Sequence, residues 1–270
     1  MNDHLIRYMN FEELYSVLKN GKLRFKKPYN WPDQYESILK QIFTEQNTYL
    51  QFINYVENKF GKEKTSTIIY RLYHLYSTQY VCCFTQFANE DNDFMWRSFA
   101  AGQETVRVEF DFGLDEDKST HIEIENKSLY IYKKNIDYSK EINSLKDYVN
   151  MIDLDSDKKT KYTYGKQLTY KRPYFINEKE VRLILATPLD EKICGLIREQ
   201  KIPNDLEQLN KEIGYNEYKD TIEYPVGREC IINVKINPFS KEGFRWCVEK
   251  LCKEYDIDYI GQSKIYNFEK

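Results

Sequence analysis

The sequence predicts an α+β fold, built on a single mixed, mainly antiparallel sheet with helical insertions. Segments with the apolar runs or the alternation of β-strands recur along the chain, for example at 79–85, 105–111 and 230–236. Segments with helical apolar spacing lie between them, and no repeat, linker or low-complexity tract divides the chain. Because 270 residues can bury one large core, we expect a single domain over residues 1–270.

The first 36 residues are predicted to form a strand, a helix, a second strand and a loop. Asn10 and Glu13 have the spacing of a helix capping box, and Asn20-Gly21 is typical of a helix end, which places a helix between strands at 5–9 and 22–25. The turn-rich loop that follows contains two prolines and four side chains able to cover a pocket: Trp31, Asp33, Tyr35 and Glu36.

The middle of the chain is predicted to alternate helices and strands. The expected elements are helices around 37–59 and 63–77, a strand over 79–85 that ends in Thr85, a helix over 94–101, a half-exposed strand over 105–111, and strands over 121–125 and 129–133. Segment 137–165 is the most polar, and we expect a helix-and-loop insertion there. Its acidic run at 153–157 lacks the glycine and the closing glutamate of a Ca²⁺ loop.

The strongest local signal lies in segment 171–186. Four charged residues between Glu178 and Arg182, interrupted only by Val181, run directly into an aliphatic segment that reads as a buried strand. Charges at the mouth of a buried strand require partners or a chemical task. The remaining expected elements are helices at 189–200, within 203–219 and at 244–255, and strands at 230–236, 257–260 and 263–266.

Composition excludes several classes of protein. Aromatic residues make up 16% of the chain, which supports a packed core rather than disorder, and the net charge of −3 gives no general attraction to nucleic acid. No apolar segment has the length of a transmembrane helix, and the N-terminus lacks a signal-peptide pattern, so we expect a cytoplasmic protein without a membrane partner. Six cysteines without a C-x-x-C pair and three scattered histidines argue against a metal centre.

Several motifs together resemble a large, mostly bacterial family catalogued as a domain of unknown function. They are Arg7-Tyr8, Cys83-Phe84-Thr85 and Asn177-Glu178-Lys179-Glu180-Val181-Arg182, with further matches at Met95-Trp96, 108–111 and 262–265. The resemblance covers nearly the whole chain. The loop at 30–34 departs from the family's usual Phe-Asn-Asp-Pro sequence, which leaves the geometry of that loop open.

A remoter resemblance is to ADP-ribosyltransferases of the DarT-like and bacterial-toxin kind. Their three motifs would correspond, in order, to Arg7 with Tyr8, to Thr85, and to Glu178-x-Glu180. The resemblance implies NAD as substrate: Arg7, Tyr8, Thr85 and Arg182 would bind it. Glu180 would stabilise the charge on the ribose, and Glu178 would orient the acceptor. On a strand both carboxylates would share one face with Arg182, which would keep them ionised.

The function predicted from this resemblance is that of a bacterial toxin or phage-defence effector. Its acceptor would be a protein or nucleic acid inside the cell, and an antitoxin or defence-system protein is an expected partner. The main alternative is a non-enzymatic sensor or binding module, in which Glu178, Glu180 and Arg182 form a structural ion-pair ladder. A metal-dependent nuclease is a more distant third, and it would need the carboxylates of Asp33, Glu36, Glu178 and Glu180 to converge.

Overall fold

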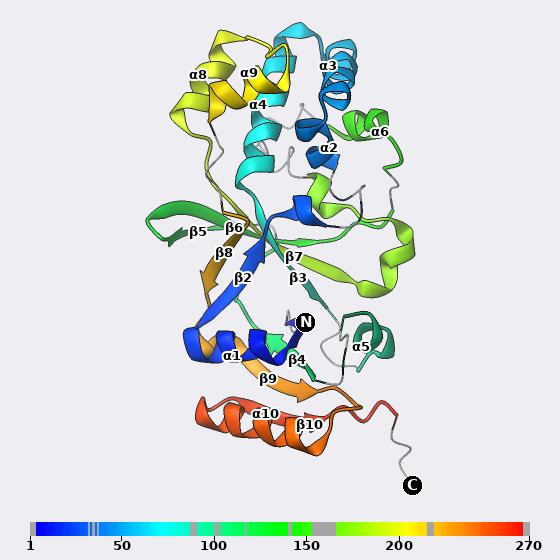
Figure 1. Cartoon of the computed structure of the whole chain (residues 1–270), viewed down its shortest axis with the longest axis vertical. Coiled ribbons are helices and arrows are strands. Elements are labelled where there is room, and N and C mark those ends of the chain that lie inside the picture. The colour runs from blue at the N-terminus through cyan, green and yellow to red at the C-terminus, as the bar shows by residue number, and fades with distance from the viewer. Residues whose placement is uncertain are drawn as a thin grey trace.

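The computed structural model shows one large sheet with helices at one end and along its flanks (Figure 1). The residues that it describes are 4–31, 33, 36, 38–86, 91–99, 102, 104–116, 118–139, 142–152, 166–214 and 219–266. Residues 140, 141 and 153–165 of the polar insertion, which include the acidic run at 153–157, and Tyr35 lie outside the described residues. Within the described part of the chain, no helix has the length and apolar character needed to cross a membrane.

The sheet has ten strands, and most of its neighbours pair antiparallel. Eight strands follow the order β10-β9-β4-β1-β3-β7-β6-β5, with only the β10–β9 pair parallel, and β2 and β8 branch from β3. The bounds are β1 Leu5–Asn10, β2 Lys22–Lys26, β3 Tyr80–Thr85, β4 Thr105–Phe110, β5 Ser119–Ile124, β6 Lys127–Asn135, β7 Glu180–Ala186, β8 Thr221–Pro225, β9 Ile231–Ile236 and β10 Asp258–Gln262.

The sheet forks at one edge of β3. Near the start of β3, Val81 pairs with Lys26 of β2, and at its end Thr85 pairs with Ile6 of β1. Between these two bridges no strand of the described residues continues the ladder on that edge, whereas the other edge pairs with β7 from Tyr80 to Thr85. The fork therefore opens a gap beside the middle of β3, and a cavity lined by β1 and β3 borders it.

The helices form two groups (Figure 1). One group packs along the lower part of the sheet in that view: α1 Phe11–Asn20, α5 Asp93–Phe99 and α10 Glu242–Glu254. The other gathers into a helical lobe at the opposite end: α2 Ile38–Thr44, α3 Gln46–Phe60, α4 Lys62–Thr78, α6 Leu145–Met151, α8 Glu191–Glu199 and α9 Leu206–Ile213. Short 3-10 turns occur at Pro28–Asn30, Lys166–Thr169, Pro173–Glu178 and Arg228–Cys230.

Each group of helices has its own buried cluster. One face of the sheet packs with α1 and α10 around side chains such as Phe25, Phe84 and Val248. The helical lobe packs around Tyr49, Phe52 and other side chains from α2, α3 and α4. Burial of this apolar surface is the main force that holds both ends of the fold.

The start of the chain forms as its local sequence predicts. The side chain of Asn10 accepts a hydrogen bond from the backbone N–H of Glu13 at 2.8 Å, and α1 ends at Gly21 in the left-handed conformation. A Cβ at Gly21 would lie only 3.2 Å from the carbonyl oxygen of Val226, so glycine suits this position for two reasons.

The predicted α+β fold with a single, mainly antiparallel sheet is confirmed, and three local predictions are wrong. The helix expected over 37–59 breaks at Glu45 into α2 and α3, and segment 263–266 forms a turn rather than a strand. The strand expected to be half exposed, β4, is buried along its whole length. Its charged residues Arg107 and Glu109 are buried because they bond to each other and to Asn233 of β9.

Candidate functional site

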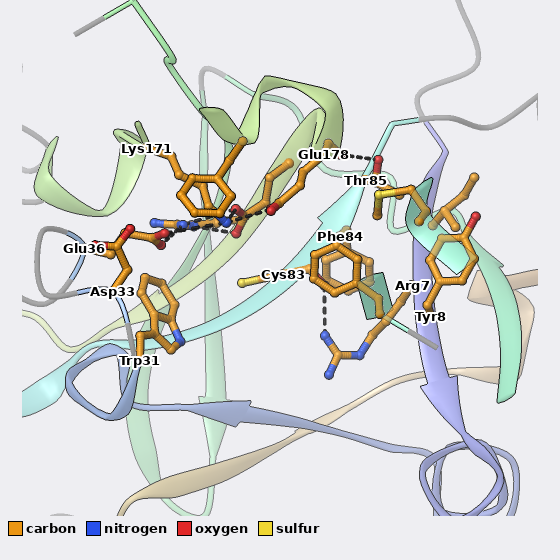
Figure 2. A pocket seen from close by; sticks show the side chains of 16 residues that line it. Arg7, Tyr8, Trp31, Asp33, Glu36, Cys83, Phe84, Thr85, Lys171 and Glu178 are labelled. Atoms are coloured by element: carbon orange, nitrogen blue, oxygen red, sulfur yellow. Dashed lines mark hydrogen bonds and ion pairs between the residues drawn. The ribbon is translucent and has the colours of Figure 1, made fainter. Parts of the chain in front are cut away.

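A cavity of about 420 Å³ lies beside the fork, against β1, β3 and β7 (Figure 2). This volume falls within the range of about 300–1,000 Å³ that is usual for small-molecule sites. Apolar, aromatic and charged side chains from distant parts of the chain line it: Ile6, Arg7, Tyr8, Trp31, Asp33, Glu36, Cys83, Phe84, Thr85, Met95, Phe99, Lys171, Phe175, Glu178, Glu180 and Arg182. All six residues predicted to form the site are among them.

The two predicted catalytic glutamates come from different local structures. Glu178 is the last residue of the 3-10 turn that Pro173 opens, Lys179 takes the left-handed conformation (φ 41°), and β7 begins at Glu180. The expectation that both lie on one strand is therefore wrong. The turn nevertheless brings both carboxylates to the same ammonium group, that of Lys171.

Lys171 is the cation around which the carboxylates gather. Its Nζ lies 2.6 Å from Glu178 Oε2, 3.0 Å from Glu180 Oε2 and 3.5 Å from Glu36 Oε1. It also lies 4.7 Å from the centre of the Phe175 ring. Burial alone would lower the pKa of Lys171, but the three carboxylates raise it above its ordinary value, so the ammonium stays charged.

Arg182 is the second cation of the site and is fully buried. Its Nε donates to Glu180 Oε1 at 2.7 Å, its Nη1 donates to the carbonyl oxygen of Leu168 at 2.9 Å, and its Nη2 contacts Glu36. The ring of Trp31 lies 4.3 Å from the guanidinium carbon. Arg182 therefore fixes Glu180 on its own strand and ties the loop that carries Trp31 and Glu36 to the sheet.

These contacts separate the acidities of the two glutamates. Burial alone would raise the pKa of Glu180, but Arg182 and Lys171 lower it to about 2. Burial raises the pKa of Glu178 above its ordinary value, and the attraction of Lys171, which lowers this pKa, does not offset the rise. Burial, and then the neighbouring Glu180 carboxylate, raise the pKa of the Cys83 thiol well above its ordinary value, so Cys83 stays protonated and is a poor nucleophile.

Thr85 and Tyr8 also border the cavity. The Thr85 hydroxyl donates to the backbone carbonyl oxygen of Glu178 at 2.6 Å and so supports the end of the 3-10 turn. The Tyr8 ring packs edge-on against Trp96 with centroids 4.7 Å apart. Burial raises the pKa of Tyr8 to about 12, so its hydroxyl keeps its proton.

Arg7 also borders the cavity, but its guanidinium turns away from the carboxylates (Figure 2). Along β1, Leu5 and Met9 belong to the core cluster that contains Phe84, whereas Ile6 and Tyr8 pack with α5 on the other face. Arg7 lies on the Phe84 side, 6.0 Å from the centre of that ring. Its Nη1 donates to the carbonyl oxygen of Cys83 at 2.8 Å and thus fills part of the fork in the sheet.

Several residues of the site carry only weak sequence signals. Lys171 is one of 40 basic residues. Its sequence neighbours do not predict its contacts with Glu178 and Glu180; the separation in sequence is only short enough for a turn to bring them together. The loop residues Trp31 and Glu36 have the signal of an aromatic, acidic turn that can cover a pocket, and the structure places both of them at the cavity.

Of the four carboxylates that the metal-dependent nuclease alternative needs, three converge, but on a lysine; the fourth, Asp33, pairs with Arg172 at 2.9 Å. Glu36, Glu178 and Glu180 each have an oxygen within 3.5 Å of Lys171 Nζ. Among the described residues, no group of three or more His, Cys, Asp or Glu side chains has an arrangement suited to a metal ion.

One of three comparisons with known proteins gave a match. Residues 95–183 match a family described as "Protein of unknown function (DUF2971)". The matched segment is shorter than half of the chain, and it contains Glu178, Glu180 and Arg182 but not Arg7 or Thr85. No curated protein and no solved structure matched the chain.

Proposed function

We propose that the cavity binds NAD and that the protein is an NAD-consuming, ADP-ribosyltransferase-like enzyme. One observation carries the proposal. Residues of all three predicted motifs border the same cavity at the fork of the sheet: Arg7 and Tyr8 of β1, Thr85 of β3, and the pair Glu178 and Glu180 at the start of β7. In the sequence they are more than 170 residues apart at the extremes, so their meeting is a property of the fold.

The charges at the cavity suit the loss of nicotinamide. Four carboxylates and three basic side chains line it, which leaves a formal charge of −1 for a cationic pyridinium ring. As the bond between ribose and nicotinamide breaks, its electron pair goes to the leaving nicotinamide and positive charge develops on the ribose. A carboxylate with a pKa of about 2, that of Glu180, is ionised at neutral pH and would stabilise this charge.

Glu178 suits the second half of the reaction. The acceptor's nucleophilic oxygen or nitrogen forms the new bond to the ribose carbon and loses a proton. A carboxylate whose pKa is raised is a better proton acceptor than an ordinary one, and burial raises the pKa of Glu178. Of the two carboxylate oxygens of Glu178, Oε2 accepts a hydrogen bond from Lys171. Oε1 accepts none from the described residues, which leaves it for the acceptor.

The acceptor would approach over the turn that ends in Glu178. Tyr174 and Ile176 of this turn are 78% and 56% exposed and form an apolar surface next to the cavity. A protein or a nucleic acid could be modified there, which is consistent with a toxin or phage-defence effector. An antitoxin or defence partner that covers Tyr174 would block access.

One observation favours a second candidate, a non-enzymatic binding or sensor module. Arg182 and Lys171 together contact both oxygens of Glu180, as expected of a structural ion-pair ladder. In that case the cavity and the exposed turn bind a ligand without catalysing a reaction, and Glu180 contributes only to the stability of the fold.

The test is incubation of the purified protein with NAD and cell extract, with nicotinamide release and label transfer as the readouts. The enzyme proposal predicts release and transfer by the wild type, no release by Glu180→Gln, and no label transfer by Glu178→Gln, in variants that melt cooperatively. Absence of release by the folded wild type, with every extract tried, would leave the binding module as the better account.

A further inference from the structure

A second cavity, of about 250 Å³, lies between α1, β1 and β2. It shares only Arg7 with the cavity that contains Glu180. Its walls are mostly charged: Arg7, Asn10, Glu12, Glu13, Ser16, Val17, Lys22, Leu23, Arg24, Lys26 and Glu223. The proposed NAD chemistry gives this cavity no role.

The guanidinium of Arg7 has few partners for a buried cation. Nη1 donates to the carbonyl oxygen of Cys83 at 2.8 Å, and Nη2 lies 3.8 Å from Glu13 Oε1, which is too far for a hydrogen bond. Its Nε is buried and has no hydrogen-bond partner among the described residues. Because a guanidinium has five N–H donors, the hydrogen bond to Cys83 leaves Arg7, which lines this cavity, with further donors to offer.

Two more basic side chains, Arg24 and Lys26, line the cavity. Arg24 and Lys26 are alternate residues of β2, so they lie on the same side of the strand, and both are exposed. In the described part of the chain neither side chain forms an ion pair or hydrogen bond. Glu223, which lies opposite Arg24 on β8, instead bonds to Lys22 at 2.7 Å.

We propose that this cavity binds a phosphate monoester of a small hydroxylated molecule, of the sugar-phosphate kind. Arg7, Arg24 and Lys26 supply the donors that a phosphate group prefers, and guanidinium groups bind it through paired hydrogen bonds. Glu12 and Glu13, on the α1 wall, would accept hydrogen bonds from hydroxyl groups of the ester. The volume lies below the range of about 300–1,000 Å³ typical of drug-sized ligands, so a whole dinucleotide is too large.

The test is isothermal titration of the full chain with ribose 5-phosphate and, separately, with inorganic phosphate, at constant ionic strength. The wild type is expected to bind one ribose 5-phosphate, and more tightly than inorganic phosphate, because only the ester carries hydroxyl groups for Glu12 and Glu13. Equal affinity for both compounds would contradict recognition of the sugar and would indicate that the cavity binds the phosphate group alone.

Two double variants with the same change in net charge decide whether the cavity is the site. Arg24→Gln with Lys26→Gln should weaken binding by about 10- to 100-fold, as expected for the loss of charge-assisted hydrogen bonds. Lys211→Gln with Lys253→Gln, at exposed positions on α9 and α10, should bind as the wild type does. Wild-type affinity in both variants, or no heat from the wild type, would overturn the proposal.

The proposal stands apart from the NAD chemistry, and one further variant separates the two. Glu180→Gln should bind ribose 5-phosphate with wild-type affinity, because Glu180 does not line this cavity. Loss of nicotinamide release together with unchanged ester binding in this variant would support both proposals. Loss of ester binding in it would place the ester in the first cavity and refute the second site.

Discussion

The ammonium nitrogen of Lys171 lies 3.0 Å from Oε2 of Glu180, although a 3-10 turn separates the two residues in the chain. The same ammonium contacts Glu178 and Glu36. Lys171 therefore balances three carboxylates that would otherwise repel one another in a partly buried site. The acidity of Glu178 depends on this cation, whereas Glu180 and Glu36 are held by Lys171 together with Arg182.

Removal of Lys171 should create affinity for divalent cations. In Lys171→Ala the carboxylates of Glu36, Glu178 and Glu180 would surround an empty position, and oxygen ligands of this kind suit Mg²⁺, Mn²⁺ or Ca²⁺. Millimolar Mn²⁺ should raise the Tm of this variant and leave the wild-type Tm unchanged. Adding Glu178→Gln should abolish the rise, and a rise of equal size in the wild type would contradict the assignment.

Loss of Arg182 should destabilise the protein strongly. Arg182→Met keeps much of the side-chain volume but leaves Glu180 and Glu36 without their buried guanidinium. Breaking a buried ion pair on one side usually costs about 3–5 kcal/mol, so the free energy of unfolding in urea should fall by about that amount. As a matched control, Arg97→Met removes an exposed ion pair with Asp93 and should cost less than about 1 kcal/mol.

Stability should fall in acid because of Glu180. Its pKa in the folded protein, about 2, is below the ordinary value of 4.5, so its contribution is present above pH 4.5 and is lost as the pH falls towards 2. The difference in unfolding free energy between the wild type and Glu180→Gln should therefore grow by about 3 kcal/mol from pH 2 to pH 5. A difference independent of pH over this interval would refute the lowered pKa.

Glu178 should act in the opposite direction. Burial raises its pKa in the folded protein, so its contribution to stability is present below its ordinary pKa and is lost as the pH rises through the raised value. The free energy of unfolding of Glu178→Gln minus that of the wild type should therefore be larger at neutral pH than at acid pH. The same pair of urea titrations, repeated at acid and neutral pH, measures this change.

The hydroxyl of Thr85 should matter through the backbone of Glu178. Thr85→Val keeps the shape of the side chain but leaves the carbonyl oxygen of Glu178 without its 2.6 Å hydrogen bond, at a cost of about 1–3 kcal/mol. Thr85→Ser keeps the hydroxyl and should restore both stability and any nicotinamide release. If Thr85→Val matched the wild type in unfolding free energy and release, the hydroxyl would have no positioning role.

The elements whose signals are local follow from the sequence. The cap at Asn10, the end of α1 at Gly21 and the buried aliphatic segment of β7 depend on neighbouring residues, and each forms as its pattern indicates. The break at Glu45 does not follow from periodicity, because apolar spacing continues on both sides of it. The burial of Arg107 depends on partners from distant strands, which periodicity does not show.

The candidate site was predictable in part. The motif residues Arg7, Tyr8, Thr85, Glu178 and Glu180 all border one cavity. Lys171 was not predictable as their partner, because its contacts depend on the 3-10 turn over Pro173–Glu178. The direction of the Arg7 side chain depends on the fork, since its guanidinium bonds to β3 where the ladder is open. Its predicted role in NAD binding stays a prediction.

The most direct measurement of the central claim compares wild type and Glu180→Gln in two assays, NAD affinity by calorimetry and the rate of nicotinamide release. If Glu180 acts on the charge that develops in the transition state, NAD affinity should change little and release should fall by about 100-fold or more. A variant that is folded, binds NAD and releases nicotinamide at the wild-type rate would contradict the account.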